Sequence, residues 1–391
     1  MMKLIQQLPQ RLTRITSGGK IIREIDGLRF LAIIPVLIQH MYERFNRNTA
    51  TPFAANTEKA VTGFFASRGF IGVYIFFIIS GFILALPFAK HHFANGKKVN
   101  VGQYFLRRVT RLEPTYILWI TIFFIIFVLH GHNSFTEYWP HYLASITYTH
   151  GLIYHKWSPI DPPTWTLEIE IQFYILAPLL ASLFFSIKNK IKRRLINLVA
   201  ILLLMILQQY FKFYTNPYNL TILGHLHYFL AGFMLADVYL CDWKEIKKIQ
   251  WYDMVAIAAL AIVLISWSWD FEFGLRIIFL VSLFILFFAV FKSVAVNRFI
   301  TNRWVTAIGG MCYTIYLIHL PLEEFLIVLT KKIHITDYFA VNLFVQLLIA
   351  LPIILMISSA FFLLFEKPFM DKDWPRRLSV SFRKTFLKPN L

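Results

Sequence analysis

The sequence predicts an all-α integral membrane protein, and three observations support this fold class. Of its 391 residues, 58% are hydrophobic and only 15% are charged, which lies outside the range of ordinary soluble domains. Hydrophobic segments recur from Leu28 to Phe365, and they are too long and continuous for barrel strands. Because only helices and closed barrels satisfy every backbone group in lipid, we expect a bundle of transmembrane helices.

Hydropathy divides the chain into about ten predicted transmembrane helices. They cover residues 28–45, 70–89, 113–130, 164–186, 195–214, 220–240, 253–270, 275–292, 311–330 and 338–365. The sequence is therefore interpreted as one membrane domain at 23–370, preceded by a cytoplasmic segment at 1–22 and followed by a basic cytoplasmic tail at 371–391.

The distribution of Lys and Arg predicts the orientation of this bundle. Of the 39 basic residues, 29 fall in the two terminal segments and in the loops on the same side. Short loops rich in positive charge stay in the cytoplasm, so both termini should be cytoplasmic. The net charge of +18 is dispersed over many loops, which is typical of topology signals and lipid headgroup contacts and does not favour nucleic-acid binding.

His40 is the first candidate for chemistry, because it lies well inside the first hydrophobic segment. Ionisable side chains are costly in a bilayer, so a histidine at this position is a functional candidate. Helix 28–45 should run from inside to outside, and a rise of about 1.5 Å per residue puts His40 about 20 Å beyond Asp26 at the cytoplasmic mouth. His40 is therefore expected in the outer half of the membrane.

A glutamate in the fourth predicted helix is the expected partner of His40. That helix should begin near Asp161, a plausible cap, so Glu170 lies about two turns below the outer surface. A carboxylate beside an imidazole raises its basicity and fixes its tautomer, as a general base acting on a hydroxyl requires. Glu168 competes for this role, but it points about 200° away from Glu170 around the helix. For both His40 and Glu170, the alternative is a structural hydrogen bond between helices.

Three arginines, Arg107, Arg108 and Arg111, precede Pro114 at the cytoplasmic end of the third predicted helix. Guanidinium groups match phosphate oxygens, so this cluster could hold a phosphorylated donor from the cytosol. On charge alone, a basic flank that sets the topology is the simpler explanation.

Two further polar residues interrupt hydrophobic helices. Ser80 lies in a stretch where small residues interrupt bulky ones, which would let another helix, or a thin substrate arm, approach closely. It is either an acyl-carrying nucleophile or a packing residue, and the absence of a local base or a nucleophile-elbow spacing favours packing. His319 either supports the site or is a satisfied core histidine.

Two long outer loops, 46–69 and 131–163, are candidates for contact with an acceptor. The second is rich in His, Tyr and Trp, which suit a sugar surface or a belt at the lipid headgroups. No metal is expected, because the His130–His132 and His225–His227 pairs have i, i+2 spacing and no HExxH pattern occurs. The two cysteines, Cys241 and Cys312, suggest neither a zinc site nor a disulfide framework.

In order and spacing, these motifs resemble the acyltransferase 3 family of integral membrane acyltransferases over nearly the whole chain. The matching motifs are Asp26-Gly27-Leu28-Arg29 with His40, Gly72-Val73 to Ser80-Gly81-Phe82, Arg108 and Arg111 with Pro114, Trp165 to Tyr174 with Pro178, Ala231-Gly232, Tyr313 to His319, and Glu366-Lys367-Pro368. Each motif alone is weak, but the combination is specific.

The resemblance implies an O-acyltransferase of the bacterial inner membrane, without a fused esterase-like domain. Its donor would be cytosolic acyl-CoA, with acetyl as the default group, and it would bind no permanent cofactor. Its acceptor would be a hydroxyl of an envelope glycan such as lipopolysaccharide O-antigen. The competing class is a transporter or exporter with buried His and Glu as a proton relay, but the sequence shows no inverted repeat.

The resemblance also implies roles for individual residues. By position, His40 and Glu170 match the family's histidine and its acidic partner, and Arg108 and Arg111 match its cytoplasmic arginine pair. Glu168 occupies a variable position. The remaining matched residues are expected to support the site: Asp26, Arg29, Ser80, Trp165, Tyr174 and His319. Phe30 and Tyr74 depart from the common pattern, which bears on the acceptor and not on this core.

Overall fold

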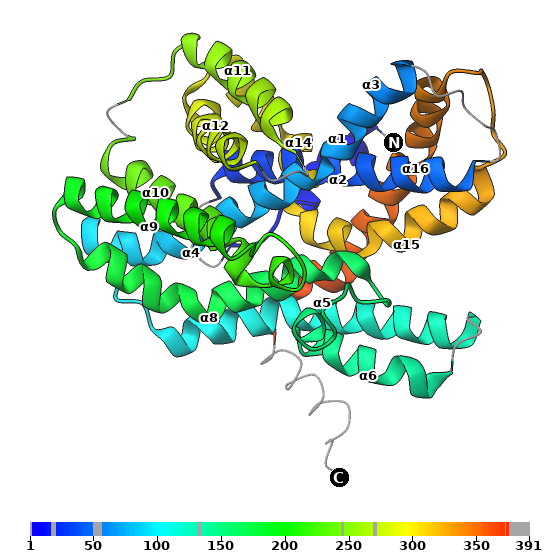
Figure 1. Cartoon of the computed structure of the whole chain (residues 1–391), viewed down its shortest axis with the longest axis horizontal. Coiled ribbons are helices and arrows are strands. Elements are labelled where there is room, and N and C mark those ends of the chain that lie inside the picture. The colour runs from blue at the N-terminus through cyan, green and yellow to red at the C-terminus, as the bar shows by residue number, and fades with distance from the viewer. Residues whose placement is uncertain are drawn as a thin grey trace.

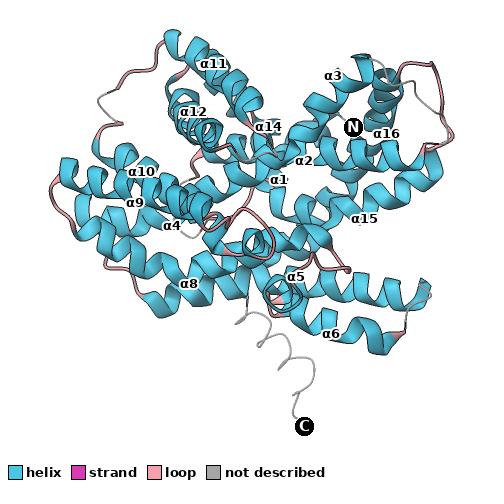
Figure 2. Ribbon diagram, viewed as in Figure 1, coloured by secondary structure: helices cyan, strands magenta, loops and turns pink. Residues whose placement is uncertain are grey.

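The fold is helical throughout the part of the chain that the structure describes. The computed structural model describes residues 2–16, 21–49, 57–130, 134–243, 246–268, 272–371 and 373–374. Within these ranges, every regular element is a helix or a helical turn, and no strand occurs (Figure 2). The predicted fold class is therefore confirmed.

Within the described ranges, ten long helices form the body of the bundle (Figure 1). They are α2 (Arg23–Asn48), α4 (Phe70–Phe93), α5 (Val101–His130), α8 (Trp165–Ser186), α9 (Lys190–Tyr210), α10 (Leu226–Cys241), α11 (Trp251–Ser266), α12 (Phe273–Lys292), α15 (Cys312–Thr330) and α16 (Phe339–Phe361).

Short helices and turns connect these long helices. The short α-helices are α1 (Met2–Arg11), α3 (Thr57–Ala66), α6 (Phe135–Ile146), α7 (His150–Tyr154), α13 (Ala295–Ile300), α14 (Arg303–Gly310) and α17 (Lys367–Phe369). The 3₁₀ turns are η1 (Ser67–Gly69), η2 (Pro162–Thr164), η3 (Tyr218–Leu220) and η4 (Ile222–Gly224), and η5 (Phe362–Glu366) is a π turn.

Each predicted transmembrane segment falls on one of the ten long helices. Among the described residues, seven helical segments are long and apolar enough to cross a membrane. They are Arg23–Asn48, Ala60–Phe93, Val101–Leu129, Pro162–Ser186, Phe273–Lys292, Cys312–Thr330 and Phe339–Phe369. The apolar helices α10 and α11 have only 16 residues each. The count of ten crossings and the cytoplasmic termini therefore stay predictions.

Some helix ends differ from those predicted by hydropathy. Helix α5 begins at Val101, about three turns before the predicted start, so its arginines lie inside the helix. Helix α10 begins only at Leu226, because the preceding residues form the turns η3 and η4. Polar and aromatic residues in a hydropathy window do not reveal such a turn.

Helix α4 occupies the centre of the bundle and packs against α2, α8 and α10. Small residues make these contacts close. A Cβ on Gly81 would lie 2.1 Å from the Phe229 carbonyl oxygen on α10, and one on Gly72 would lie 2.1 Å from the Ala32 carbonyl oxygen on α2. The close helix approach predicted from the small residues around Ser80 is therefore confirmed.

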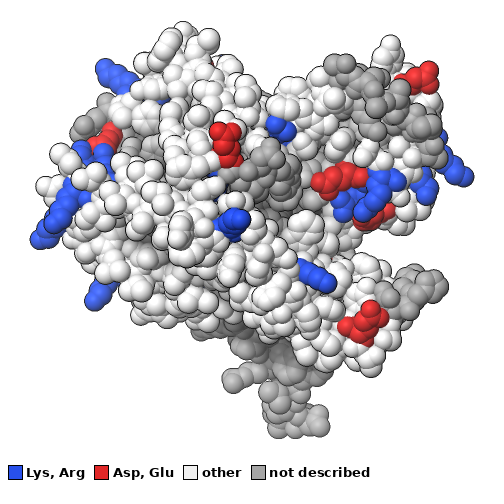
Figure 3. All heavy atoms as spheres, in the orientation of Figure 1, with Lys and Arg blue, Asp and Glu red and all other residues white. Residues whose placement is uncertain are grey.

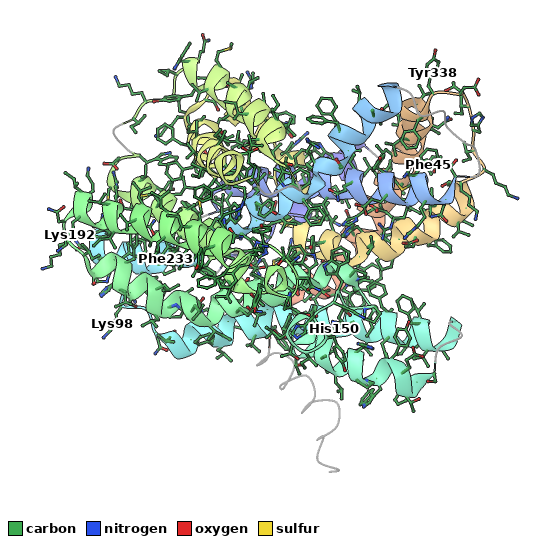
Figure 4. The ribbon with its side chains drawn as sticks, in the orientation of Figure 1. Phe45, Lys98, His150, Lys192, Phe233 and Tyr338 are labelled. Carbon is green, nitrogen blue, oxygen red and sulfur yellow. The ribbon has the colours of Figure 1, made fainter. Side chains whose placement is uncertain are left out.

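The outer surface of the bundle is apolar. Leu179 and Leu183 on α8 and Leu195 on α9 are each about 60% exposed, and charged side chains are sparse over most of the face shown in Figure 3. Such a surface suits lipid tails. In Figure 4, Lys98 and Lys192 lie toward one end of the molecule and Phe45 toward the opposite end. The end of α2 that carries His40 therefore points away from these lysines.

Candidate active site

A cavity of about 110 Å³ lies where α2, α4, α5, α8 and α15 meet the turn η5. Its walls are largely apolar and aromatic. Five charged side chains also line it: Arg29, Arg108, Arg111, Glu170 and Glu366. Buried charge is costly inside a membrane bundle, so these three guanidinium groups are expected to be paired or functional.

Helix α5 supplies two of the three arginines. Arg108 and Arg111 are spaced i, i+3 and share one face of the helix, so both line the cavity. The guanidinium of Arg108 lies 5.2 Å from the ring centre of Tyr174. Arg111 Nε is buried and has no hydrogen-bond partner among the described residues. Such an unfilled donor suits an anionic ligand.

Arg107 lies apart from this pair. Its side chain is exposed and does not line the cavity, because neighbouring residues of a helix point about 100° apart. The sequence cluster of three arginines is therefore split by the structure into two cavity residues and one surface residue.

The third cavity arginine, Arg29, is held in place by Asp26. One oxygen of the Asp26 carboxylate accepts hydrogen bonds from Arg29 Nη1 and Arg14 Nε, each at 2.7 Å. Burial lowers the pKa of Arg14 to about 10, and the nearby Arg29 charge acts in the same direction. Arg14 thus still carries its charge at neutral pH. Asp26 and Arg14 orient Arg29, and they do not themselves line the cavity.

Glu170 lies in the cavity wall, but it is not the partner of His40. Its Oε1 accepts a hydrogen bond from the Tyr174 hydroxyl at 2.5 Å and another from the Ser80 hydroxyl. Within the described residues, no hydrogen bond or ion pair joins Glu170 to His40. The predicted contact is therefore wrong. The depth of a residue along a helix axis says nothing about the direction in which its side chain points.

The contact between Ser80 and Glu170 also corrects the sequence interpretation of Ser80. We expected no base near this serine, since none lies beside it in the sequence. The structure places a carboxylate oxygen from another helix within hydrogen-bonding distance of its hydroxyl.

The structure gives His40 a different carboxylate partner, Glu43. His40 Nδ1 lies 3.2 Å from Glu43 Oε2, one turn further along α2, and 3.5 Å from Arg44 Nη1. When Nδ1 carries a proton and donates to Glu43, Nε2 is left free to accept one. The i, i+3 spacing of His40 and Glu43 was available in the sequence as a signal for this pair.

His319 lies directly against His40, with the ring centres 5.2 Å apart. It is fully buried, and its Nδ1 lies 2.7 Å from the Tyr316 carbonyl oxygen. A carbonyl only accepts, so Nδ1 carries the proton and donates it, and Nε2 has no hydrogen-bond partner within the described part of the chain. His319, which was predicted to support the site, thus lies beside His40.

Tyr316 connects this histidine pair to the cavity. Its ring centre lies 5.6 Å from that of His319, and its side chain lines the cavity wall. The Tyr316 hydroxyl donates to the Pro163 carbonyl at 2.8 Å and lies 2.7 Å from the Thr166 hydroxyl. His319 and Tyr316 therefore separate His40 from the cavity in this structure.

Two other glutamates differ in their relation to the cavity. Glu366 was given no site role from the sequence, and Glu168 was the competitor of Glu170. Glu366 lines the cavity and accepts hydrogen bonds from the amide and hydroxyl of Thr314, at 3.2 and 2.5 Å. Its only sequence signal was the Glu-Lys-Pro motif. Glu168 is buried elsewhere and accepts from the Gly151 amide at 2.8 Å, which holds the loop before α8. Of the two glutamates that competed as the partner of His40, only Glu170 lines the cavity.

Asp161 does not cap the helix that follows it. Both of its carboxylate oxygens are buried, and neither has a hydrogen-bond partner in the described ranges. The predicted capping role is therefore wrong. Its backbone carbonyl closes the turn instead, accepting from the Thr164 amide at 3.2 Å.

This burial predicts an effect of replacing Asp161 with asparagine. Burial raises the pKa of the Asp161 carboxyl well above its ordinary value. The folded state then binds the proton more tightly than the unfolded state, so the stability that this group contributes below about pH 4 is lost as the pH rises. Asp161→Asn should raise stability at pH 8 by roughly 1–3 kcal/mol and flatten its dependence on pH.

Thermal unfolding of the detergent-purified protein at pH 5 and pH 8 measures this effect. Asp337→Asn is the matched control, because Asp337 is fully exposed and should leave the unfolding temperature unchanged. A lower unfolding temperature for Asp161→Asn at pH 8 would show that the carboxylate has a stabilising partner there.

The site and the fold together define a class of protein: a helical membrane protein with an internal, arginine-lined cavity beside two neighbouring histidines, the partly exposed His40 and the buried His319. The acyltransferase domain family Acyl_transf_3 matches residues 22–363, and the chain belongs to this family. The resemblance found in the sequence motifs is thus confirmed.

Two curated relatives from Staphylococcus aureus match the chain. The chain is 24% identical over 328 residues to the O-acetyltransferase OatA, an alignment that covers 77% of this chain and 50% of the relative. A second relative from strain COL, whose name also describes an O-acetyltransferase, is 23% identical over 330 residues with the same coverage. The chain spans about half the length of these relatives. No solved structure matches it.

Proposed function

We propose that this protein transfers an acetyl group from cytosolic acetyl-CoA to a hydroxyl of an envelope glycan, such as lipopolysaccharide O-antigen, across the bacterial inner membrane. The observation that carries this proposal is the internal cavity with Arg29, Arg108 and Arg111 in its wall. Membership of the acyltransferase family and the names of the two relatives support the reaction class.

The arginines account for the donor. Coenzyme A carries several phosphate oxygens, and guanidinium groups bind such oxygens strongly and with defined geometry. The pantetheine arm is thin and largely uncharged, and it would lie against apolar cavity walls such as Phe76, Ile79 and Ile83. This arrangement directs the thioester toward Tyr316 and the histidine pair.

His40 accounts for the transfer step. Its Nε2 takes the proton from the acceptor hydroxyl, and the hydroxyl oxygen forms a bond to the thioester carbonyl carbon. The carbon–sulfur bond then breaks, and the thiolate of coenzyme A leaves with the proton from the imidazolium. The Glu43 carboxylate at Nδ1 stabilises the imidazolium between these steps. Rotation of the Tyr316 side chain would bring the thioester within reach.

Glu170 has a different role in this scheme. Its carboxylate fixes the hydroxyls of Ser80 and Tyr174 in the cavity wall. Tyr174 in turn lies under the Arg108 guanidinium, so Glu170 positions a surface on which the donor rests. It is a positioning residue.

The proposal is tested by mass spectrometry of envelope glycans from cells with and without the gene, grown with isotopically labelled acetate. We expect acetylated sugars that carry the label and that disappear when the gene is removed. Unchanged glycans, together with uptake or export of an unmodified substrate by vesicles that contain the protein, would instead favour a transporter.

A further inference from the structure

A second cavity, of about 170 Å³, lies between α4, α8, α9 and α12. It is formed where α4, α8 and α12 begin and where α9 ends, and the turns η3 and η4 close one side of it. The predicted orientation places these ends on the side opposite the lysine-rich loops. No role has been assigned to this cavity so far.

Aromatic rings form much of the cavity wall. Six aromatic residues line it: Phe70, Tyr74, Trp157, Trp165, Tyr214 and Tyr228. The rings of Phe70 and Trp165 stack at 6.3 Å, and Trp157 is 57% exposed. Aromatic faces of this kind pack against the C–H faces of sugar rings while polar groups around them bind the hydroxyls.

Three polar atoms among the lining residues are buried acceptors without a donor. Gln208 Nε2 donates to the Gly224 carbonyl at 2.6 Å, and this leaves Gln208 Oε1 without a partner. His225 Nε2 lies 2.9 Å from the Asn219 carbonyl oxygen, to which it must donate, so its Nδ1 is an unfilled acceptor. The third of these lining atoms is Asn219 Oδ1, which has no donor within the described part of the chain.

These acceptors indicate the chemistry of the ligand. A buried polar atom without a partner is costly, and each of these three requires a hydrogen-bond donor. An anion or a carbonyl group could accept from the Arg276 guanidinium, which also lines the cavity, but it donates no hydrogen bond to these three atoms, whereas a sugar hydroxyl can both accept and donate. A sugar ring has several hydroxyl donors and apolar C–H faces, and it therefore matches the acceptors and the aromatic rings of this cavity.

We propose that the second cavity binds a hexose ring of the acceptor glycan. The ring hydroxyls donate to Gln208, Asn219 and His225, and a C–H face packs against the neighbouring aromatic side chains. The role as acceptor subsite depends on the proposed transferase function, whereas the binding of a sugar does not.

The two cavities share a wall, which supports their use by two reactants. Consecutive residues of α4 line different cavities, Val73 the first and Tyr74 the second. Phe77 lines the first cavity, and its ring centre lies 5.1 Å from that of His225 in the second. The Phe70 amide donates to the side chain of Gln39, the residue before His40, at 3.0 Å. A sugar in the second cavity would thus lie next to the wall of the donor cavity and close to α2.

Binding of methyl β-D-glucoside to the full-length protein in nanodiscs tests this proposal, with saturation-transfer NMR as the readout. Cyclohexylmethanol, which has a similar ring without ring hydroxyls, is the ligand control. His225→Phe keeps a ring in contact with Phe77 and removes the acceptor nitrogen, and we expect it to raise the Kd for the glucoside by about tenfold. Trp157→Ala should have an effect of similar size.

Trp139→Ala is the matched control for the tryptophan variant, because Trp139 is a partly exposed residue of α6 that does not line the cavity. Its Kd should equal that of the wild type. Absence of glucoside binding to the wild type, a cavity filled by water alone, or equal affinity in His225→Phe would overturn the proposal.

A further pair of measurements separates this proposal from the proposed function. The variant His40→Ala should bind the glucoside normally although its rate of acetyl transfer is strongly reduced. If the glucoside binds but no acetylated glycan is ever formed by the wild type, the transferase function fails and the sugar cavity stands. If transfer occurs and His225→Phe leaves the KM for the glycan unchanged, the cavity assignment alone fails.

Discussion

Replacing His40 with alanine should lower the rate of acetyl transfer by about 100- to 10,000-fold, which is the contribution typical of a general base. The imidazole of His40 can take a proton from a hydroxyl and then return it to the leaving thiolate. Transfer of labelled acetyl from acetyl-CoA to glycan, followed in membranes that contain equal amounts of each variant, measures the effect.

The control for this experiment is His92→Ala. His92 is exposed at the end of α4 and lies outside both cavities, so its removal should leave the rate unchanged. Normal membrane insertion of His40→Ala must accompany the loss of activity. Transfer at the wild-type rate by His40→Ala would remove the histidine from the mechanism.

Replacing Arg111 with alanine should raise the KM for acetyl-CoA by about 10- to 100-fold, because a hydrogen bond to a charged group contributes about 1.5–3 kcal/mol. Arg111 lines the cavity, and its Nε is buried without a partner within the described residues. The KM for the glycan should stay nearly constant, since the proposed acceptor subsite is the second cavity, which Arg111 does not line. Steady-state kinetics with each substrate varied in turn separates the two effects.

Arg107→Ala is a matched control, because it removes the same charge from the same helix. Its side chain is exposed and outside the cavity. If the arginines act only as a basic flank that sets the topology, both variants should behave alike. Equal KM values for acetyl-CoA in Arg107→Ala and Arg111→Ala would therefore contradict a donor site at Arg111.

The fold class was predictable from sequence because it depends on composition and on the length of apolar segments. Each predicted segment coincides with a long helix, since backbone groups in lipid have few alternatives to helical hydrogen bonding. The pairing of Arg108 with Arg111 was implied by the family resemblance, and their i, i+3 spacing explains why both line the cavity. Helix ends were less predictable, as at Leu226, because turns there depend on local backbone geometry.

The partners of the site residues were harder to predict, because they depend on how helices are rotated about their axes. Glu170 and His40 were placed at similar depths from the rise per residue, yet Glu170 contacts Ser80 and Tyr174. Glu43, which does contact His40, lies on the same helix and was detectable by spacing. The second cavity had a partial sequence signal, the aromatic loop 131–163 that supplies Trp157. The rest of its wall combines residues from segments far apart in the chain, so the cavity itself was not predictable.

The central claim is that donor and acceptor reach one site from opposite sides of the membrane. Sealed vesicles of both orientations, supplied with membrane-impermeant labelled acetyl-CoA on the outside only, test it most directly. We predict that label enters the glycan when the lysine-rich loops face the donor, as in inverted vesicles, and that Arg111→Ala weakens this transfer. Equal labelling in right-side-out vesicles, or labelling only there, would contradict the account.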